Sequence, residues 1–231
     1  MNSAVIISHH PCLDGFAAAT IMRQWLVSKA VAPEDIKWYP GVYGKPPPEV
    51  TKDDQVFVLD FSYPPEVMVD LADKSKELLW IDHHISSIEA WEQSRFVAPD
   101  NMYAVLSRDN SSSGALLTWE YCFGLTAPAV VRAIDDRDRW QFKFIDTKDI
   151  CAYGFSLPDG EFGAMWEFLC SEDTKRVAEH GSALTAAQTK NCEALVEQAA
   201  AFTGSFLGLD IAAMNCPYFM ASECAHIMLA R

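Results

Sequence analysis

Short apolar runs that alternate with helical stretches are the feature of this sequence that most restricts its fold. The runs are rich in β-branched residues, and an apolar segment of about four to eight residues bounded by turn signals is typical of a buried strand. Strands separated by helices form parallel sheets, because a parallel connection needs a long crossover. The sequence therefore predicts an α/β fold, with a parallel sheet and helices on both faces. We expect strands at 4–8, 36–39, 56–59 and 78–81, and helices at 14–29 and 64–76.

The second half of the chain has a mostly helical pattern. Three serines at 111–113 can cap a helix that runs to about Cys122 and is stopped by Gly124. A long alanine-rich helix is expected to break near Gly181, since glycine lowers helix stability. This long helix spans 173–202. Further helices are expected at 127–134, 162–169 and 222–231, with two short strands at 205–209 and 211–215 around Asp210.

Residues that can bind metal ions follow three of the expected strands. Ligands of parallel sheets bind beyond the carboxyl ends of the strands, so these side chains would meet at one edge. Each alone has a common structural explanation, as a turn residue, a helix cap or a self-paired surface charge. Together they favour a metal site, because carboxylates gathered at one edge repel each other unless cations lie between them. The residues are His9, His10, Cys12 and Asp14 after the first strand, Asp60 after the 56–59 strand, Asp82, His83 and His84 after the 78–81 strand, and Asp135, Asp136 and Asp138 after a helix.

The charge balance restricts the class of partner. The formal net charge is −14, whereas a protein that grips long nucleic acid usually has a basic face. We therefore expect no stable complex with long nucleic acid. The acidic excess can serve solubility, or it can reflect carboxylates that bind divalent cations. Carboxylate oxygens combined with imidazole favour Mn²⁺, and Mg²⁺, Co²⁺ or Zn²⁺ are also compatible.

Cysteine usage and hydropathy bear on the cellular compartment. The seven cysteines are odd in number and form no Cys-x-x-Cys pair, which argues against a disulfide framework and for a reducing compartment. The sequence has no apolar run of membrane-spanning length and no signal-peptide core at its start. We expect a cytoplasmic protein without a membrane partner.

Four motifs in the same order resemble those of the DHH phosphoesterase family, over about residues 4–145. Cys12 stands where most members place an aspartate, and a branch with the pattern His-x-x-Cys-x-Asp-Gly-Phe is more similar to this sequence. The serine-led helix SSSGALLTWEY is similar to that branch as well. The motifs are His9-x-x-Cys12-x-Asp14-Gly15-Phe16, Asp60, Asp82-His83-His84, and Asp136 within the segment IDDRDRW.

The resemblance implies two divalent metal ions, with Mn²⁺ the first choice, and a water activated between them. His84 would contact the phosphate as a donor or proton-transfer partner, and Asp82 would orient a neighbouring histidine. Arg137 could contact phosphate, although an ion pair with a nearby aspartate explains it equally well. The implied ligands are His9, Asp60 and Cys12 for one ion and Asp14, Asp60, His83 and Asp136 for the other, with Asp60 as the bridge.

Three choices within this set stay open. His10 is the neighbour of His9, although the family spacing to Cys12 favours His9. Asp138 is an alternative to Asp136. A thiolate is a softer ligand than a carboxylate, so Cys12 would either shift the preference toward zinc or iron or weaken that metal site.

The resemblance also implies a domain order. It predicts a DHH catalytic metal-binding domain at 1–150, a helical linker region at 151–202, and at 203–231 the start of a DHHA1-like substrate-binding domain. The glycine- and histidine-rich motif that ends such a domain is absent, so we expect this last α/β part to be incomplete.

The implied activity is Mn²⁺-dependent hydrolysis of phosphodiester bonds in short oligonucleotides or small nucleotides. One alternative is a pyrophosphatase or a phosphomonoesterase that acts on a small molecule. Another, from a different class, is a metal-binding or nucleotide-sensing protein without turnover. The sequence leaves a homodimer open.

Overall fold

A five-stranded parallel sheet forms one half of the protein, which confirms the α/β class. The computed structural model describes residues 3–124, 126–198, 202–206 and 208–230. All neighbouring strands of the sheet are parallel, in the order β2-β1-β3-β4-β5. The strands are β1 (Ser3–His9), β2 (Ile36–Gly41), β3 (Asp54–Leu59), β4 (Glu77–Asp82) and β5 (Met102–Leu106).

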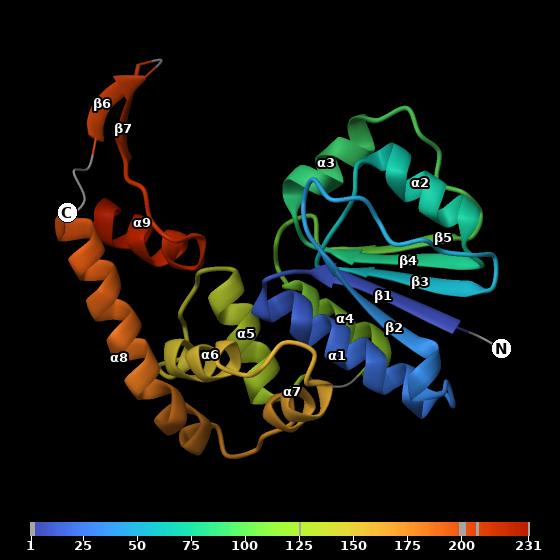
Figure 1. Ribbon diagram of the computed structural model, residues 1–231, viewed down its shortest axis with the longest axis horizontal. Helices are drawn as coiled ribbons and strands as arrows, with labels where there is room; N and C mark the ends of the chain where they lie inside the picture. Colours follow the sequence, from blue (N-terminus) through green and yellow to red (C-terminus); the bar gives the residue numbers. More distant parts are fainter. Residues whose placement is uncertain (1–2, 125, 199–201, 207, 231) are drawn as a thin grey trace.

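Helices cover both faces of this sheet (Figure 1). Successive residues of β1 point to opposite faces, so Ala4 and Ile6 pack on one side and Val5 and Ile7 on the other, and all four are buried. This is why the predicted central strands are continuous apolar runs rather than alternating ones. One face carries α1 (Leu13–Ser28) and α4 (Gly114–Phe123), and the other carries α2 (Pro65–Lys74) and α3 (Ile85–Gln93).

Two elements of this half were not predicted. The strand β5 lies at the edge of the sheet, and Tyr103 and Ala104 in its middle are exposed. An edge strand of this kind lacks the buried apolar run on which the prediction relied. The helix α3 buries only Ile88, so its apolar periodicity is also weak.

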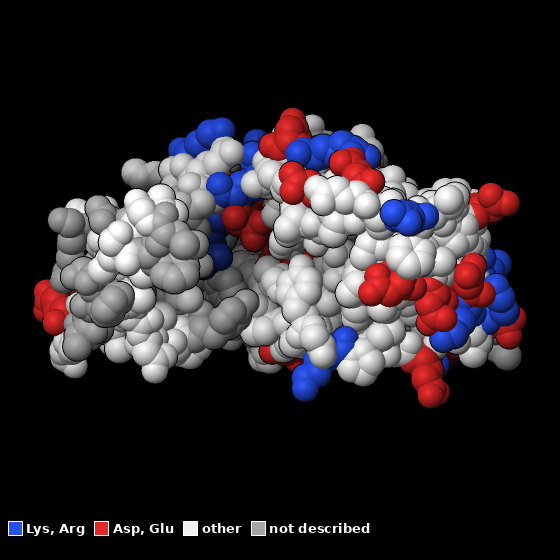
Figure 2. Space-filling model, turned by 90° about the horizontal axis from the view of Figure 1, so that it is seen from above, with Lys and Arg blue, Asp and Glu red and all other residues white. Residues whose placement is uncertain are grey.

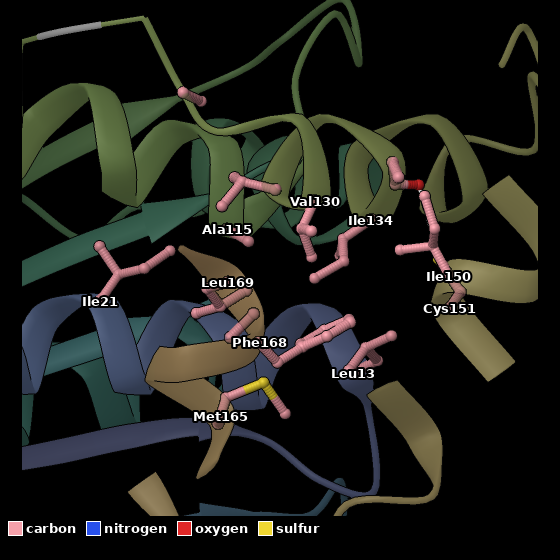
Figure 3. Close-up of a cluster of buried hydrophobic side chains, with 14 of the residues drawn as sticks. Leu13, Ile21, Ala115, Val130, Ile134, Ile150, Cys151, Met165, Phe168 and Leu169 are labelled. Carbon is pink, nitrogen blue, oxygen red and sulfur yellow. Dashed lines mark hydrogen bonds between the residues drawn. The ribbon is translucent and has the colours of Figure 1, made fainter. Parts of the chain in front are cut away.

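A second core joins the sheet half to a group of three further helices. These are α5 (Ala129–Asp138), α6 (Thr147–Phe155) and α7 (Phe162–Leu169). Figure 3 shows Leu13 and Ile21 of α1 packed with side chains of these helices, among them Ile134 and Phe168. The sequence predicted that this helix ends at residue 134, but α5 continues to Asp138. The acidic run therefore belongs to its last turns.

The long helix α8 (Thr174–Gln198) continues through Gly181, so the predicted break is wrong. A Cβ atom at Gly181 would lie 1.8 Å from the backbone oxygen of Asp149 in α6. Glycine at this position therefore allows two helices to approach closely, which offsets its low helix propensity.

The C-terminal part forms a hairpin and a helix beside the end of α8 (Figure 1). The strands β6 (Phe202–Phe206) and β7 (Leu209–Ala213) are antiparallel, and α9 (Ala221–Leu229) packs on α8 through Cys192 and Cys224. Asp210 lies in β7 and not in the turn, because the strands begin earlier than predicted. Residues 199–201, 207 and 231 of the predicted elements lie outside the described residues.

The division of the chain at residues 150 and 202 stays a prediction. In the described part of the chain, no helix combines the length and the apolar character that crossing a membrane requires.

Two short 3-10 helices complete the secondary structure that is described. They are Pro33–Asp35, before β2, and Tyr218–Met220, before α9.

Candidate metal centre

The predicted ligands meet where the order of the strands reverses. The chain leaves β1 through α1 to β2 on one side, whereas β3, β4 and β5 follow on the other side. The point between β1 and β3 is therefore a topological switch point, at which sheets of this kind bind ligands. His9 ends β1, Asp60 follows β3, and Asp82 ends β4.

Asp60 occupies the middle of the cluster, and its two carboxylate oxygens face different groups. Its Oδ2 lies 3.8 Å from Nδ1 of His9 and 3.5 Å from Sγ of Cys12. Its Oδ1 lies 3.1 Å from Nε2 of His83 and 3.8 Å from Nδ1 of His84. Asp60 thus connects two sets of metal-capable side chains, His9–Cys12–Asp60 and Asp60–His83–His84.

A third set consists of Asp14, His83 and Asp138. Nε2 of His83 lies 3.3 Å from Oδ2 of Asp138. Oδ1 of Asp14 accepts hydrogen bonds from the Ser113 hydroxyl (2.6 Å) and the Ala115 backbone amide (3.1 Å). Its Oδ2 is buried without a hydrogen-bond partner in the described structure. An orphaned buried carboxylate oxygen is costly, and a cation would satisfy it, so the residues present fit a metal site.

The titration behaviour of the cluster reflects this crowding of negative charge. Burial and the charges of Asp60 and Asp138 raise the pKa of Asp14 well above its usual value. Burial and the charge of Asp60 raise the pKa of Asp138 to about 6. Burial opposes the protonation of His83, but its hydrogen bond to Asp60 and the nearby acids prevail and raise its pKa to about 10. Each of these raised pKa values means that the surrounding carboxylates favour the binding of a positive charge, here a proton.

The pKa of Asp60 is shifted in the opposite direction from the pKa values of Asp14 and Asp138. Burial alone would raise its pKa, but hydrogen bonds from His83 and His9 and the charge of His84 lower it below the usual value. Asp60 is therefore the carboxylate of the cluster that ionises most readily, as a shared ligand must.

Hydrogen bonds orient both histidines of the DHH triplet. Nδ1 of His83 lies 2.8 Å from Oδ1 of Asn110, and because that oxygen only accepts, Nδ1 must donate. Nε2 is then the atom whose proton a bound cation would displace, which would leave a lone pair directed at the cluster, as in most histidine metal ligands. Nδ1 of His84 lies 2.7 Å from Oδ1 of Asp82. Asp82 also accepts a hydrogen bond from the backbone amide of His83 (2.8 Å), so it holds both residues.

The structure places the members of two alternative pairs, His9 or His10 and Asp136 or Asp138, in different surroundings. His10 lies 3.9 Å from exposed Asp159 and against the ring of Trp38, and His9 is the histidine at the cluster. Asp136 belongs to none of the three sets of candidate ligands in the described chain, whereas Asp138 does. The geometry therefore favours Asp138 over Asp136, and the choice of ligand stays a proposal.

Asp136 has a different position and a full set of partners. Its carboxylate accepts hydrogen bonds from the backbone amides of Lys143 (2.9 Å) and Phe144 (3.2 Å) and from the hydroxyl of Thr147 (2.6 Å). Burial opposes its ionisation, but these hydrogen bonds lower its pKa. Asp136 thus anchors the loop that joins α5 to α6.

Exchanging each of these two acids for asparagine should separate their roles. Asp138→Asn is expected to lower Mn²⁺ affinity at least about 10- to 100-fold, since even changes outside the ligand set have that effect. Asp136→Asn is expected to cost about 1–3 kcal/mol of stability, because charged acceptors form the stronger hydrogen bonds. Calorimetric Mn²⁺ titration and thermal melts of both variants measure this. Weakened Mn²⁺ binding in Asp136→Asn with an unchanged melting temperature would contradict the assignment.

Arg137 points away from the cluster. Its guanidinium donates to Oε1 of Glu223 in α9 at 2.7 Å and lies 4.6 Å from the ring centre of Phe155. Arg139 pairs with Asp135 at 2.6 Å. A contact between Arg137 and substrate phosphate stays a prediction.

Several residues at the site were not identified from the sequence. The ring of Tyr43 lies 5.3 Å from that of His9, and Asn110 orients His83. Ser113 is the N-cap residue of α4, but its hydroxyl donates to Asp14 and makes no cap hydrogen bond. A Cβ atom on Gly114 would lie 2.5 Å from Cβ of Asp60. The sequence signal for Ser113 and Gly114 is the serine-led motif, which predicts a helix cap and resembles the same family branch.

The backbone at the site includes uncommon conformations. Asp60 has φ = 51° and Asn110 has φ = 51°. Non-glycine residues seldom adopt positive φ, although aspartate and asparagine tolerate it best. Strain of this kind is concentrated at functional sites, where the surrounding structure enforces it.

Figure 2 shows charges of both signs scattered over the face seen from above. Lys and Arg lie in separate groups among Asp and Glu on this face, rather than in one continuous strip. A strip of that kind would be expected of a protein that tracks a long phosphate backbone.

Comparison with known proteins gives limited similarity. No family model matches the chain. It is 24% identical over 178 residues to the uncharacterized protein R106 of Acanthamoeba polyphaga mimivirus, over 73% of this chain and 40% of that protein. A crystal structure of RecJ from Thermus thermophilus in complex with Mn²⁺ has a TM-score of 0.42 and 12% identity, over 85% of this chain and 37% of RecJ. The chain thus spans less than half the length of each, and at this similarity the activity of RecJ is not transferred to it.

Proposed function

We propose that this protein is a DHH-type phosphoesterase that uses two divalent metal ions, with Mn²⁺ as the first choice. The observation that carries the proposal is the position of Asp60, whose two oxygens face two different sets of ligand atoms at distances of 3.1–3.8 Å. A carboxylate in this position suits a bridge between two cations. His9 and Cys12 would complete one site, and Asp14, His83 and Asp138 the other.

Bound metal ions would activate a water molecule and neutralise the charge that develops on the phosphoryl oxygens. The protein's own residues would position the substrate around them. His84 has a side chain that is 30% exposed, and its Nδ1 is held by Asp82. Burial opposes protonation of His84, but its hydrogen bond to Asp82 and the charge of Asp60 raise its pKa. In the protonated ring, Nε2 would donate a hydrogen bond to a phosphoryl oxygen or pass a proton to the leaving group. Asp82 would act as a positioning residue that fixes this orientation.

The metal affinity of the site formed by His9, Cys12 and Asp60 would depend on Cys12. Burial and the charges of Asp60, Asp138 and Asp14 raise the pKa of its thiol well above the usual value. A cation at this position would lower that pKa, because a coordinating thiol is deprotonated outright.

Changing Cys12 to aspartate tests whether this residue is a ligand. In a ligand role, Cys12→Asp should maintain or raise Mn²⁺-dependent hydrolysis, since a harder oxygen ligand suits Mn²⁺. Without metal, the added carboxylate should lower the melting temperature, by about 2–4 °C for each kcal/mol of repulsion, and Mn²⁺ should restore it. Thermal melts with Mn²⁺ and with EDTA, alongside Cys12→Ser, measure both effects. Loss of stability that Mn²⁺ does not restore would indicate a packing role instead.

Hydrolysis of bis-nitrophenyl phosphate with Mn²⁺, together with metal content per chain, tests the proposal as a whole. Two ions per chain and release of nitrophenol that EDTA abolishes are the expected results. Zero or one ion with no turnover would favour a metal-binding or nucleotide-sensing protein. Turnover restricted to pyrophosphate or to a phosphomonoester would favour the other enzyme class.

For the natural substrate we propose short oligonucleotides or small nucleotides. The acidic net charge of −14 weakens long-range attraction to a polyanion, so a short substrate with few phosphates is favoured. A panel of dinucleotides, longer oligoribonucleotides, cyclic dinucleotides and pyrophosphate, each with Mn²⁺, should give the highest kcat/KM for the shortest chains. A rate that rises steadily with chain length would contradict this choice.

A further inference from the structure

A pocket with aromatic walls lies where the end of α5 and the helix α6 face α8 and α9. Its apolar walls include Trp140, Phe142 and Phe155, and its polar lining includes Arg137, Gln188 and Thr189. We call it the aromatic pocket. Ligand sites commonly combine apolar and aromatic walls with a few polar groups that converge on the ligand.

The aromatic rings are partly open to a ligand. Trp140 is 36% exposed and Phe155 is 51% exposed. Trp140 and Phe142 meet edge to face, with ring centres 5.0 Å apart. Two cations lie close to the walls, because Arg137 is 4.6 Å from the ring centre of Phe155 and Nζ of Lys148 is 5.1 Å from that of Phe142. The pocket therefore offers flat apolar surface together with Lys148 and the ion pair of Arg137 with Glu223.

The loop that carries two of these rings has an unusual backbone. Trp140 has φ = 56° and Phe142 has φ = 49°. Positive φ is a genuine outlier for bulky side chains, and residues in such conformations persist only where the surrounding structure enforces them. Here the amide of Trp140 donates to the carbonyl of Arg137 (2.8 Å), and the amide of Phe142 donates to the carbonyl of Asp136 (3.5 Å). The Asp136 carboxylate holds the residues that follow, Lys143 and Phe144. The loop thus holds both rings in a set position at an energetic cost.

The pocket is adjacent to the candidate metal centre. Arg137 lines the pocket, and the next residue, Asp138, belongs to the set with Asp14 and His83. Consecutive Cα atoms are about 3.8 Å apart. Arg137 and Asp138 point to different sides of α5, so a nucleotide with its base in the pocket would extend past the end of this helix to place its phosphate at the metal centre.

One face of α8 supplies polar groups to the pocket. Thr185, Gln188 and Thr189 all line it, and their spacing of three and four residues places them on one side of the helix. Hydroxyl and amide groups both donate and accept hydrogen bonds. They match the mixed donors and acceptors on the edge of a nucleobase, and no such match exists for a purely apolar ligand.

We propose that the aromatic pocket binds the nucleobase of a terminal nucleotide, with the base against the rings of Phe155, Trp140 and Phe142 and its edge toward α8. This inference rests on the proposed phosphoesterase function, because it assigns part of the substrate of that same site. Stacking of a base on an aromatic side chain is tolerant of sequence. The pocket would therefore select nucleotide substrates over phosphate esters without a base, and would select weakly among bases.

Phe155→Ala tests the stacking surface, and Phe144→Ala is its matched control. Phe144 is 48% exposed, as Phe155 is 51% exposed, but it does not line the aromatic pocket. Removal of one stacked ring should weaken binding of a nucleoside 5′-monophosphate by roughly 5- to 150-fold, and the control should leave binding unchanged. Calorimetry in the presence of EDTA measures this, so that metal sites do not contribute.

A second pair of variants covers the case in which Phe155→Ala fails to fold. Ala152→Trp would fill the pocket, and Ala164→Trp makes the same change on α7, outside the pocket. The first should abolish nucleoside monophosphate binding and lower kcat/KM for a dinucleotide. Neither should change the affinity for Mn²⁺ measured by calorimetry, because Ala152 and Ala164 belong to none of the candidate ligand sets in the described chain.

The results separate this inference from the proposed function. If the wild-type protein hydrolyses bis-nitrophenyl phosphate but binds no nucleoside monophosphate, or if the pocket variants act on the dinucleotide as the controls do, the inference fails and the proposed function stands. If the wild-type protein hydrolyses neither ester, the proposed function fails. Metal-independent binding that is lost in Ala152→Trp and kept in Ala164→Trp would still support a nucleotide pocket.

Discussion

Asp60→Asn is expected to lower Mn²⁺-dependent ester hydrolysis at least about 100-fold, because changes even outside the ligand set cost 10- to 100-fold and Asp60 belongs to two of the three ligand sets. Asparagine keeps the shape of the side chain but removes its charge. It therefore cannot bridge two cations as a carboxylate does. Turnover of bis-nitrophenyl phosphate measured with saturating Mn²⁺ gives the size of the loss.

The choice of asparagine protects the fold in this test. Asp60 has φ = 51°, a conformation that asparagine tolerates and that alanine would adopt only with strain. Asp70→Asn is a matched control, since Asp70 lies on α2 and pairs only with Lys74 at an exposed position. Circular dichroism and the melting temperature of the metal-free protein should be close to wild type in both variants. Near-wild-type turnover in Asp60→Asn would overturn the assignment of the bridge.

Binding of Mn²⁺ is expected to raise the melting temperature by about 5–11 °C. A ligand at 100 times its dissociation constant adds about 2.7 kcal/mol, and each kcal/mol shifts the melting temperature of a domain of this size by about 2–4 °C. The physical source is the repulsion among Asp14, Asp60 and Asp138, which is visible in the raised pKa values of Asp14 and Asp138. Two cations would remove that repulsion and would satisfy the buried Oδ2 of Asp14.

Removal of the metal provides the reverse measurement. Addition of EDTA should return the melting temperature to that of the metal-free protein, and Asp60→Asn should show little Mn²⁺-dependent shift. Mg²⁺, Co²⁺ and Zn²⁺ at the same concentration report the preference of the site, including the effect of Cys12. An equal shift in wild type and in Asp60→Asn would mean that the cations bind elsewhere on this acidic protein.

Local pattern was sufficient for much of the fold. Val56–Leu59 and its neighbouring strands are apolar on both faces, and a run of that kind is stable mainly between two layers of helices. The sequence prediction failed where a strand has an exposed middle, and where packing between helices overrides the low helix propensity of glycine. The strand β5 has an exposed middle, and α8 continues through Gly181 because α6 lies against it.

The sequence by itself determined which residues end the strands, and therefore which edge of the sheet gathers His9, Asp60, Asp82 and His83. That follows from the two-residue period of a strand and from the rule that parallel strands share their carboxyl edge. The different positions of Asp136 and Asp138, by contrast, depend on the tertiary structure. Residues two apart on a helix point about 200° apart, so the choice depends on where α5 ends and what packs on each side. Asp138 faces His83 and Asp136 faces Thr147, and the intervening Arg137 reaches α9.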